Sequence, residues 1–172
     1  MALLPILEVP DPRLKIKAAP VAEVDAELRK LAADMLETMY QAPGIGLAAT
    51  QVGAMKRVCV VDVTDKKNGE EPRPMVLVNP DITWRSEDAE SAEEGCLSLP
   101  SHYADVIRPR SVRVRYRDLD GVEQEVAADG LLARCLQHEI DHLDGVLFID
   151  RISALKRSMI LRKIAKTRRA RA

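Results

Sequence analysis

The chain has few aromatic side chains, few cysteines and no long apolar run. Aromatic residues make up 3% of its 172 residues, so the core must be built mainly from aliphatic side chains and methionine. No segment approaches the roughly 18 consecutive apolar residues of a membrane-spanning helix, and the start lacks a signal-peptide pattern. The three cysteines lie in unrelated contexts and suggest no disulfide framework. We therefore expect a cytoplasmic protein with no membrane partner.

The order of the predicted elements indicates a single α+β domain covering residues 1–172. An amphipathic helix is expected to begin after Asp25 and to end before Pro43. The expected strands lie at residues 57–63, 75–79, 81–85, 111–118 and 122–126. Asp120 and Gly121 form a strong hairpin signal between the last two strands. Because these strands precede the next helix as a group, we expect antiparallel sheets packed around that helix.

The most informative pattern is His138-Glu139-x-x-His142, which lies in a segment that is predicted to be helical. Asp129 is placed to cap this helix and Gly145 to end it, and no proline interrupts the residues between them. Residues four apart in a helix are about 40° apart around the axis and about 6 Å apart along it. Both imidazoles can therefore bind one metal ion, with Glu139 beside it to accept a proton.

A catalytic metal ion needs a third protein ligand. Metallopeptidases that share the histidine pattern take this ligand from further along the chain, as a His six residues after the second one or as a later Glu. Phe148 occupies the first of these positions, and no Glu follows Glu139. The third ligand must therefore come from elsewhere in the sequence.

The three thiols are the remaining candidates for this ligand. Cys59 lies in an apolar, β-branched run that predicts a buried strand, so its thiol is expected in the core. Cys135 is too far along the helix axis to bind one ion together with both histidines, and we expect it in the core beneath the site. Cys96 lies between Gly95 and Pro100, where the backbone is expected to turn. It is the preferred third ligand.

Three separate segments together resemble the peptide deformylase family. They are residues 44–51 (Gly-Ile-Gly-Leu-Ala-Ala-Thr-Gln), 94–100 (Glu-Gly-Cys-Leu-Ser-Leu-Pro) and 137–143 (Gln-His-Glu-Ile-Asp-His-Leu). The first residues and the closing helix are also similar, so the resemblance covers essentially the whole chain. The one difference within these motifs is Leu99, a position at which the family more often has Ile or Val. The side-chain volume is roughly the same. Glu94 is expected to pair with Arg108 and so hold the cysteine loop in place.

The resemblance implies a metal-dependent hydrolase. Enzymes of this family remove the formyl group from the N-terminal methionine of newly made polypeptides, and their substrates here would be nascent formyl-methionyl peptides. Motif matching implies that Cys96, His138 and His142 hold one divalent metal ion, which leaves the fourth position for water. Fe(II) is the metal that the family commonly uses, and zinc, nickel or cobalt often replaces it.

The resemblance also implies roles for residues around the metal. Glu139 would accept a proton from the attacking water and pass it to the departing amine. The Gln51 side chain and the backbone N–H of Leu97 would stabilise the oxyanion that forms on the formyl group. In the family, residues 44–51 lie along the bound peptide like an added strand, so Gly46 is expected to hydrogen-bond the substrate.

The glycine-rich segment at residues 44–46 is expected to border a substrate and not a phosphate. No Gly-Lys-Ser or Gly-Lys-Thr follows it, and the third glycine of a dinucleotide fingerprint is replaced by Ala49. Glycine lets another backbone approach closely. An apolar pocket for the methionine side chain is expected to be lined by Ile45, Leu131, Cys135 and the wall around His138.

Two other functions fit part of the pattern. His102, six residues after Cys96, could complete a four-ligand structural zinc site in an RNA-binding module, but the motif glutamate would then have no role. A peptidase that cuts internal peptide bonds would share the chemistry but lacks the downstream ligand. Formate release from formyl-Met-Ala-Ser, compared with cleavage of a casein-type substrate, separates these functions.

Charge is distributed unevenly along the chain. Residues 156–172 contain eight basic residues and no acidic one, which leaves 18 basic and 27 acidic residues in the rest. A basic helix is expected over residues 153–172, beginning after Ser153, with Leu155, Met159 and Ile164 docking it on the domain. Such a segment is typical of a solubilising tail or of one that binds RNA phosphates. In some deformylases this helix contacts the ribosome, which is therefore a candidate partner.

Overall fold

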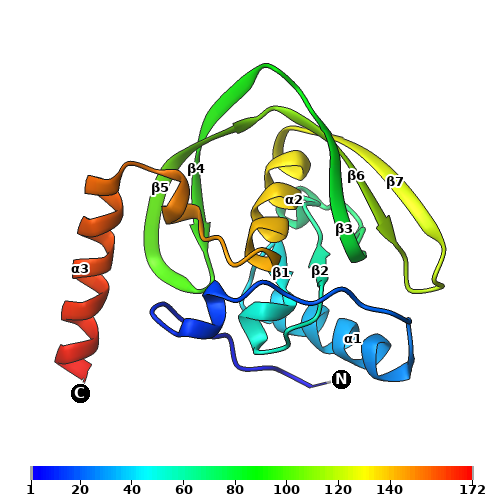
Figure 1. Ribbon diagram of the computed structural model, residues 1–172, viewed down its shortest axis with the longest axis horizontal. Helices are drawn as coiled ribbons and strands as arrows, with labels where there is room; N and C mark the ends of the chain where they lie inside the picture. The colour runs from blue at the N-terminus through cyan, green and yellow to red at the C-terminus, as the bar shows by residue number, and fades with distance from the viewer. Residues whose placement is uncertain (1, 172) are drawn as a thin grey trace.

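In the computed structural model, which describes residues 2–171, two antiparallel sheets pack around a buried helix (Figure 1). The larger sheet has the order β1-β2-β3-β6-β7, with β1 Gly46–Ala48, β2 Val58–Val61, β3 Met75–Arg85, β6 Ser111–Arg117 and β7 Glu123–Asp129. A separate hairpin is formed by β4 Ala89–Cys96 and β5 Leu99–Pro109. The expected α+β class with antiparallel sheets around a central helix is confirmed.

Three α-helices complete the architecture. They are α1 Ala26–Gln41, α2 Gly130–Leu143 and α3 Ala154–Arg171. Short 3-10 turns join the elements at η1 Pro12–Lys15, η2 Ala49–Val52, η3 Lys66–Asn68 and η4 Phe148–Arg151. Within residues 2–171, none of the helices combines the length and the apolar character needed to cross a bilayer.

The helix ends agree with the sequence at most positions. The Asp25 carboxylate accepts the N–H of Leu28 at 2.8 Å and so caps α1. Gly145 follows the end of α2 with φ 75°, a conformation that glycine adopts without steric cost. The predicted cap of α2 is wrong, because Asp129 occupies the N-cap position but its carboxylate accepts a hydrogen bond from Ser111 Oγ at 2.6 Å instead.

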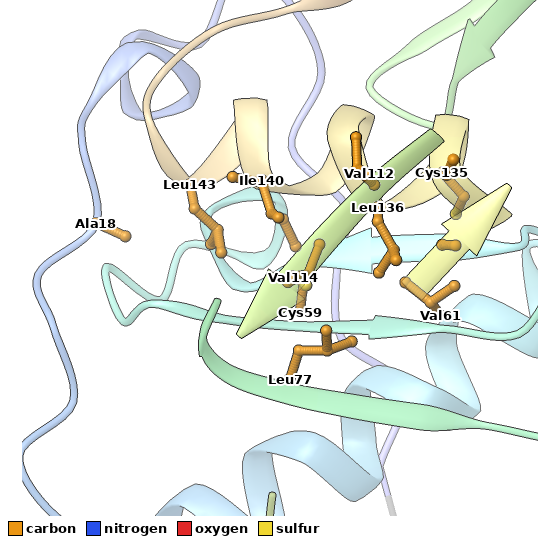
Figure 2. Packing of buried hydrophobic residues seen from close by; sticks show 13 residues of the cluster. Ala18, Cys59, Val61, Leu77, Val112, Val114, Cys135, Leu136, Ile140 and Leu143 are labelled. Carbon is orange, nitrogen blue, oxygen red and sulfur yellow. The ribbon is translucent and has the colours of Figure 1, made fainter. Parts of the chain in front are cut away.

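The core forms where α2 packs on one face of the larger sheet. Figure 2 shows Leu136, Ile140 and Leu143 of α2 against the sheet residues Val112, Val114, Cys59, Val61 and Leu77, all of them buried. The alternate residues of β2, Val58 and Val60, are buried against α1 on the opposite face. Each fully buried aliphatic side chain of this kind contributes about 1.5–3 kcal/mol of transfer free energy. The helix that carries both motif histidines is therefore rigidly placed.

The strands differ from expectation at two points. Residues 75–85 form one strand, where two were expected, and a register shift lies between Val78 and Asp81 in the pairing of β3 with β6. Pro80 lies at this shift, where its missing N–H costs no regular ladder bond. Strands β1, β4 and β5 were not expected, because β1 is short and most side chains of β4 are polar and exposed.

Helix α3 begins after Ser153 as predicted, and of its three expected docking residues Ile164 is confirmed. Leu155 is 72% exposed and Met159 is 49% exposed, so the expectation that they dock the helix is wrong. The residues that pack on the core cluster of Leu14, Leu99 and Phe148 are Ile160, Leu161 and Ile164. Residue 172 of the expected helix lies outside the described residues. The docked face therefore includes Ile164 as expected, together with Ile160 and Leu161, which were not expected there.

Candidate metal and catalytic site

The ligand atoms of Cys96, His138 and His142 converge where the β4–β5 hairpin meets α2. Cys96 ends β4 beside the turn that Leu97 and Ser98 form, as the sequence predicts. The Nε2 atom of His142 lies 3.3 Å from Cys96 Sγ and 3.2 Å from His138 Nε2. All three ligand atoms lie within 4.8 Å of one another. The structure thus brings together the three residues that the sequence selects.

This arrangement fits one metal ion. Ligand atoms bound tetrahedrally at about 2.0–2.3 Å from an ion lie roughly 3.3–3.7 Å apart, which is close to the separations seen here. Burial, together with the charge of His138, lowers the pKa of His142 well below its ordinary value. Burial also acts to lower the pKa of His138, but its hydrogen bonds to Cys96 and Glu94 outweigh this and raise that pKa. A metal ion would bind both imidazoles in the neutral form, so it would displace the proton that His138 holds. Within residues 2–171, His102 does not belong to the group, so a four-ligand structural site has no support.

The Glu139 carboxylate is buried between the metal site and β1. Its Oε1 has no hydrogen-bond partner within the described residues, and burial raises the pKa of Glu139 to about 7. A Cβ added to Gly46 would lie 2.5 Å from Glu139 Oε2 and 2.9 Å from Cys135 Sγ, so only glycine fits there without a shift. Cys135 is buried beneath the site, as predicted, and its thiol donates to the Ile45 carbonyl at 3.6 Å.

Gln51 is held so that its amide nitrogen faces the cysteine. Its Oε1 accepts the N–H of Ala48 at 2.9 Å, which leaves Nε2 directed at Ser98 Oγ, 3.1 Å away, and at Cys96 Sγ, 3.5 Å away. The backbone N–H of Ser98 also points at the sulfur, at 3.4 Å. Leu97 lies in the turn directly after the cysteine. Hydrogen-bond donors therefore surround the position where a thiolate would carry its charge.

Glu94 is a buried carboxylate that joins the hairpin to α2. Its Oε1 accepts from His138 Nδ1 at 2.8 Å, and its Oε2 accepts from Arg108 Nε at 2.6 Å and from Arg134 Nη1 at 2.7 Å. Burial raises the pKa of Glu94, but hydrogen bonds from His138 and Arg108 outweigh it and bring the pKa to about 2. The expected pair of Glu94 and Arg108 is confirmed, and it is buried instead of exposed.

Asp141 extends this network and was not expected to have a role. It lies between the two histidines in the sequence and accepts from Arg108 Nη1 at 2.8 Å. Arg151 of η4 donates to both of its oxygens, at 2.8 and 3.1 Å. Arg108 thus contacts carboxylates on β4 and on α2 at once. A sequence signal did exist, because Asp141 is an acidic residue within the His138–His142 motif, between Ile140 and the ligand His142.

A cavity of about 560 Å³ opens beside the ligand atoms. Its lining includes the residues expected around the substrate, namely Ile45, Gly46, Gln51, Leu97, Leu131, Cys135, His138 and Glu139. Ile45 and Leu131 are 42% and 55% exposed, which places them at its mouth. Ile6 and Tyr103 also line it and were not expected there. The size suits one side chain and part of a peptide backbone.

Comparison with known proteins agrees with this geometry. The family model of polypeptide deformylase matches residues 3–158. The chain belongs to this family. A peptide deformylase of Rhizobium meliloti (strain 1021) is 57% identical over 175 residues, which cover 100% of this chain and 99% of the relative. The deformylase model ends within α3, so the basic C-terminal half of that helix lies beyond the matched region.

Solved deformylase structures have the same fold. The crystal structure of peptide deformylase from Ehrlichia chaffeensis has a TM-score of 0.92 at 40% sequence identity, covering 98% of each chain. A structure of peptide deformylase from the same organism in complex with actinonin has a TM-score of 0.91 at 43% identity, covering 97% of this chain and 98% of that one. The similarity therefore extends over nearly the whole chain.

Removing the charge of Glu94 should weaken metal binding. In Glu94→Gln, His138 loses its carboxylate partner, and we expect zinc affinity to fall about 10- to 100-fold. Affinity is measured by competition with a chromogenic chelator, together with the thermal unfolding midpoint with and without zinc. Glu90→Gln on the same strand is the control, because the Glu90 side chain is 53% exposed. Equal zinc affinities in the two variants would contradict the role of Glu94.

The close approach of Gly46 to Glu139 predicts a coupled pair. Gly46→Ala should lower the free energy of unfolding by about 1–3 kcal/mol, because the added methyl group displaces the carboxylate. In a Glu139→Ala background most of this cost should disappear, leaving the part due to Cys135. Urea unfolding of the four proteins in the double-mutant cycle, all metal-free, measures the coupling. The same cost in both backgrounds would show that the two residues do not touch.

Proposed function

We propose that this chain hydrolyses the formyl group of nascent formyl-methionyl peptides, releasing formate and leaving a free N-terminal methionine. The family to which it belongs performs this reaction. The single observation that carries the proposal is the convergence of Cys96, His138 and His142 on one point, with the buried Glu139 carboxylate in the wall of the adjoining cavity. The three ligands would hold a Lewis-acidic metal ion, and Glu139 would carry a proton beside it.

The metal is proposed to be Fe(II), as the family implies, with zinc, nickel or cobalt able to replace it. When bound, a divalent ion supplies a Lewis acid that acidifies water and polarises the formyl oxygen. Cys96, His138 and His142 would hold it, and three protein ligands are typical of catalytic sites. One sulfur and two imidazole nitrogens suit all four of these metals.

Glu139 is proposed to move the proton. Its carboxylate accepts a proton from the water whose oxygen attacks the formyl carbon, and gives it to the amine nitrogen as the C–N bond breaks. The burial of Glu139 and its unpartnered Oε1 support this role, because no neighbouring donor within residues 2–171 holds that oxygen. The formyl carbon leaves as part of formate, and the amine becomes the new N-terminus of the peptide.

Gln51 and Leu97 are proposed to stabilise the oxyanion that forms on the formyl group. The Gln51 Nε2 atom already faces the site because Ala48 fixes the other end of the amide. The Leu97 N–H would be the second donor, from the turn after Cys96. One such donor typically contributes about 3–4 kcal/mol to the lowering of the barrier.

The methionine side chain is proposed to enter the cavity beside the metal site. Ile45, Leu131 and Cys135 lie in its wall and give it an apolar lining. Strand β1 is the edge of the larger sheet, so Gly46 can hydrogen-bond an extended peptide that adds to this edge. The substrate would then be held by backbone pairing on one side and by side-chain burial on the other.

The location and organisation of the protein follow from this function. We place it in the cytoplasm, where new polypeptides are made and where a thiol ligand stays reduced. Residues 1–172 are proposed to act as one catalytic domain, with the basic helix of residues 153–172 as its end. The packing of Ile160, Leu161 and Ile164 of α3 on the same core supports this division.

Replacing the proton carrier should separate catalysis from metal binding. Glu139→Gln removes the base but leaves the three ligands, so we expect formate release from formyl-Met-Ala-Ser to fall about 10²- to 10⁴-fold with metal content unchanged. The protein is purified anaerobically, metal is measured by elemental analysis, and Glu90→Gln is the control. Activity within tenfold of the unchanged protein, or faster cleavage of a casein-type substrate than of the formyl peptide, would refute the proposal.

Helix α3 is proposed to contact the ribosome through its basic residues. Truncation after Ser153 should then reduce co-sedimentation with ribosomes at low salt, and moderate salt should reduce it further. Formate release from formyl-Met-Ala-Ser reports whether the truncated protein is still folded. Co-sedimentation that is unaffected by truncation would show that α3 does not bind the ribosome.

A further inference from the structure

A second cavity, of about 920 Å³, lies between α3 and the body of the protein. We call it the α3 groove. Its lining comes from three segments, residues 8–12, 98–102 and 163–171. Figure 1 shows α3 beside the β4–β5 hairpin, with its C-terminal half extending toward the level of the N-terminal segment. Ser98, in the turn directly after Cys96, is part of the lining of the groove.

The wall that α3 contributes is strongly basic. Its charged residues are Lys163, Lys166, Arg168 and Arg171. Within residues 2–171, none of these four forms an ion pair. The facing wall holds Glu8 and Asp11, and the Asp11 carboxylate is already bound by Arg13 Nη2 at 2.8 Å. The positive charge of the α3 wall therefore remains available for an anionic group.

The α3 groove adjoins the cavity beside the metal site. Pro100 and Ser101 line both of them, and both residues are exposed. A peptide whose first residue occupies the catalytic cavity would therefore reach the groove by passing over these two residues. The accessible apolar lining of the groove comes from Pro10, Pro12, Pro100 and the half-buried Ile164, above the buried Val9 and Leu99. This lining can cover the backbone of such a peptide.

We propose that the α3 groove binds the downstream residues of the substrate chain and favours acidic side chains among them. The proposal rests on the deformylase function above, because it takes the N-terminal methionine as the anchored end. The groove makes the enzyme sensitive to sequence well beyond the residue that it deformylates. Formylated chains with acidic residues from about the fourth position onward are the preferred substrates.

The dimensions agree with this occupant. From Lys163 to Arg171 the helix rises about 12 Å at about 1.5 Å per residue. About four residues of an extended peptide span the same length at roughly 3.3 Å each. The four basic residues of the wall can therefore contact a run of about four downstream residues.

A peptide fits the α3 groove better than RNA does. RNA carries a negative charge at every nucleotide, so part of a strand in the groove would face Glu8, which lies opposite the basic residues. Peptide side chains can point toward α3 while the backbone lies on the apolar lining. Other basic residues of α3, Lys156, Arg162 and Arg169, do not line the groove and are exposed, which leaves them for a nucleic-acid partner.

The first experiment varies the substrate. Formate release is measured for formyl-Met-Ala-Ser and for the same peptide extended by four Glu, four Gln or four Lys residues. We expect kcat/KM for the Glu peptide to exceed that for the Lys peptide about five- to tenfold at low salt, through KM and not kcat, because several exposed charge pairs each contribute modestly. The ratio should approach 1 in 0.5 M salt, which screens such pairs. A ratio near 1 at low salt overturns the proposal.

The second experiment locates the effect in the α3 groove. The triple variant Lys163→Gln, Lys166→Gln, Arg168→Gln should lower the Glu-to-Lys ratio to about 2 or less while keeping turnover of formyl-Met-Ala-Ser. The control removes the same charge outside the groove, in Lys156→Gln, Arg162→Gln, Arg169→Gln, and should keep the ratio of the unchanged protein. Equal losses in the two triple variants would assign the effect to net charge and overturn the proposal.

Direct binding separates this inference from the proposed function. Fluorescence anisotropy of labelled formyl peptides reports affinity even if no formate is released, so a preference for the Glu peptide without turnover would refute only the catalytic proposal. Turnover of formyl-Met-Ala-Ser with no Glu preference in either assay would refute only the groove. Loss of ribosome co-sedimentation in the groove variant, with the peptide ratio unchanged, would assign the groove to RNA and overturn its assignment to peptide.

Discussion

A single buried carboxylate, Glu94, joins the two layers that supply the metal ligands. The cysteine comes from a hairpin and the two histidines from a helix, so their convergence depends on how these elements are held together. Glu94 accepts from His138 on one side and from Arg108 and Arg134 on the other. Burying a carboxylate costs several kcal/mol unless charged donors surround it, and here they do. Loss of Glu94 would leave the buried His138 and the largely buried Arg134 without their carboxylate partner.

The same network explains why the site does not depend on the metal alone for its shape. Arg108 also binds Asp141, which stands between the two histidines, and Arg151 binds the same carboxylate from η4. The helix is thereby held to the hairpin from one face, while its apolar face packs on the larger sheet. Both the rotation and the position of α2 are therefore fixed. The Nε2 atoms of His138 and His142 are held 3.2 Å apart. The cysteine sulfur is held in turn by contacts with the Gln51 side chain and the Ser98 backbone N–H.

The sequence predicts this site better than it predicts the fold around it. Spacing within one helix is a local property, so the positions of His138, Glu139 and His142 follow from helical geometry alone. The sulfur ligand follows by elimination among three cysteines. The hairpin that positions it could not be predicted, because its strands lack alternating apolar residues and are stabilised by a buried ion network between distant segments. Such pairing joins distant segments and appears only when the chain is folded. The face of α3 that docks also depends on contacts with distant segments, so Leu155 and Met159 were wrongly expected to dock it.

Helices α2 and α3 differ in burial in a way that folding alone does not explain. Helix α2 is buried along most of its length, whereas α3 has no fully buried residue and contacts the core through Ile160, Leu161 and Ile164. Like charges spaced three or four residues apart destabilise a helix, and the basic residues of α3 have such neighbours without acidic partners on the helix. Its composition therefore opposes its own stability. The basic face of such a helix is best explained by an anionic partner that binds to it. This face borders the α3 groove, which shares Pro100 and Ser101 with the catalytic cavity.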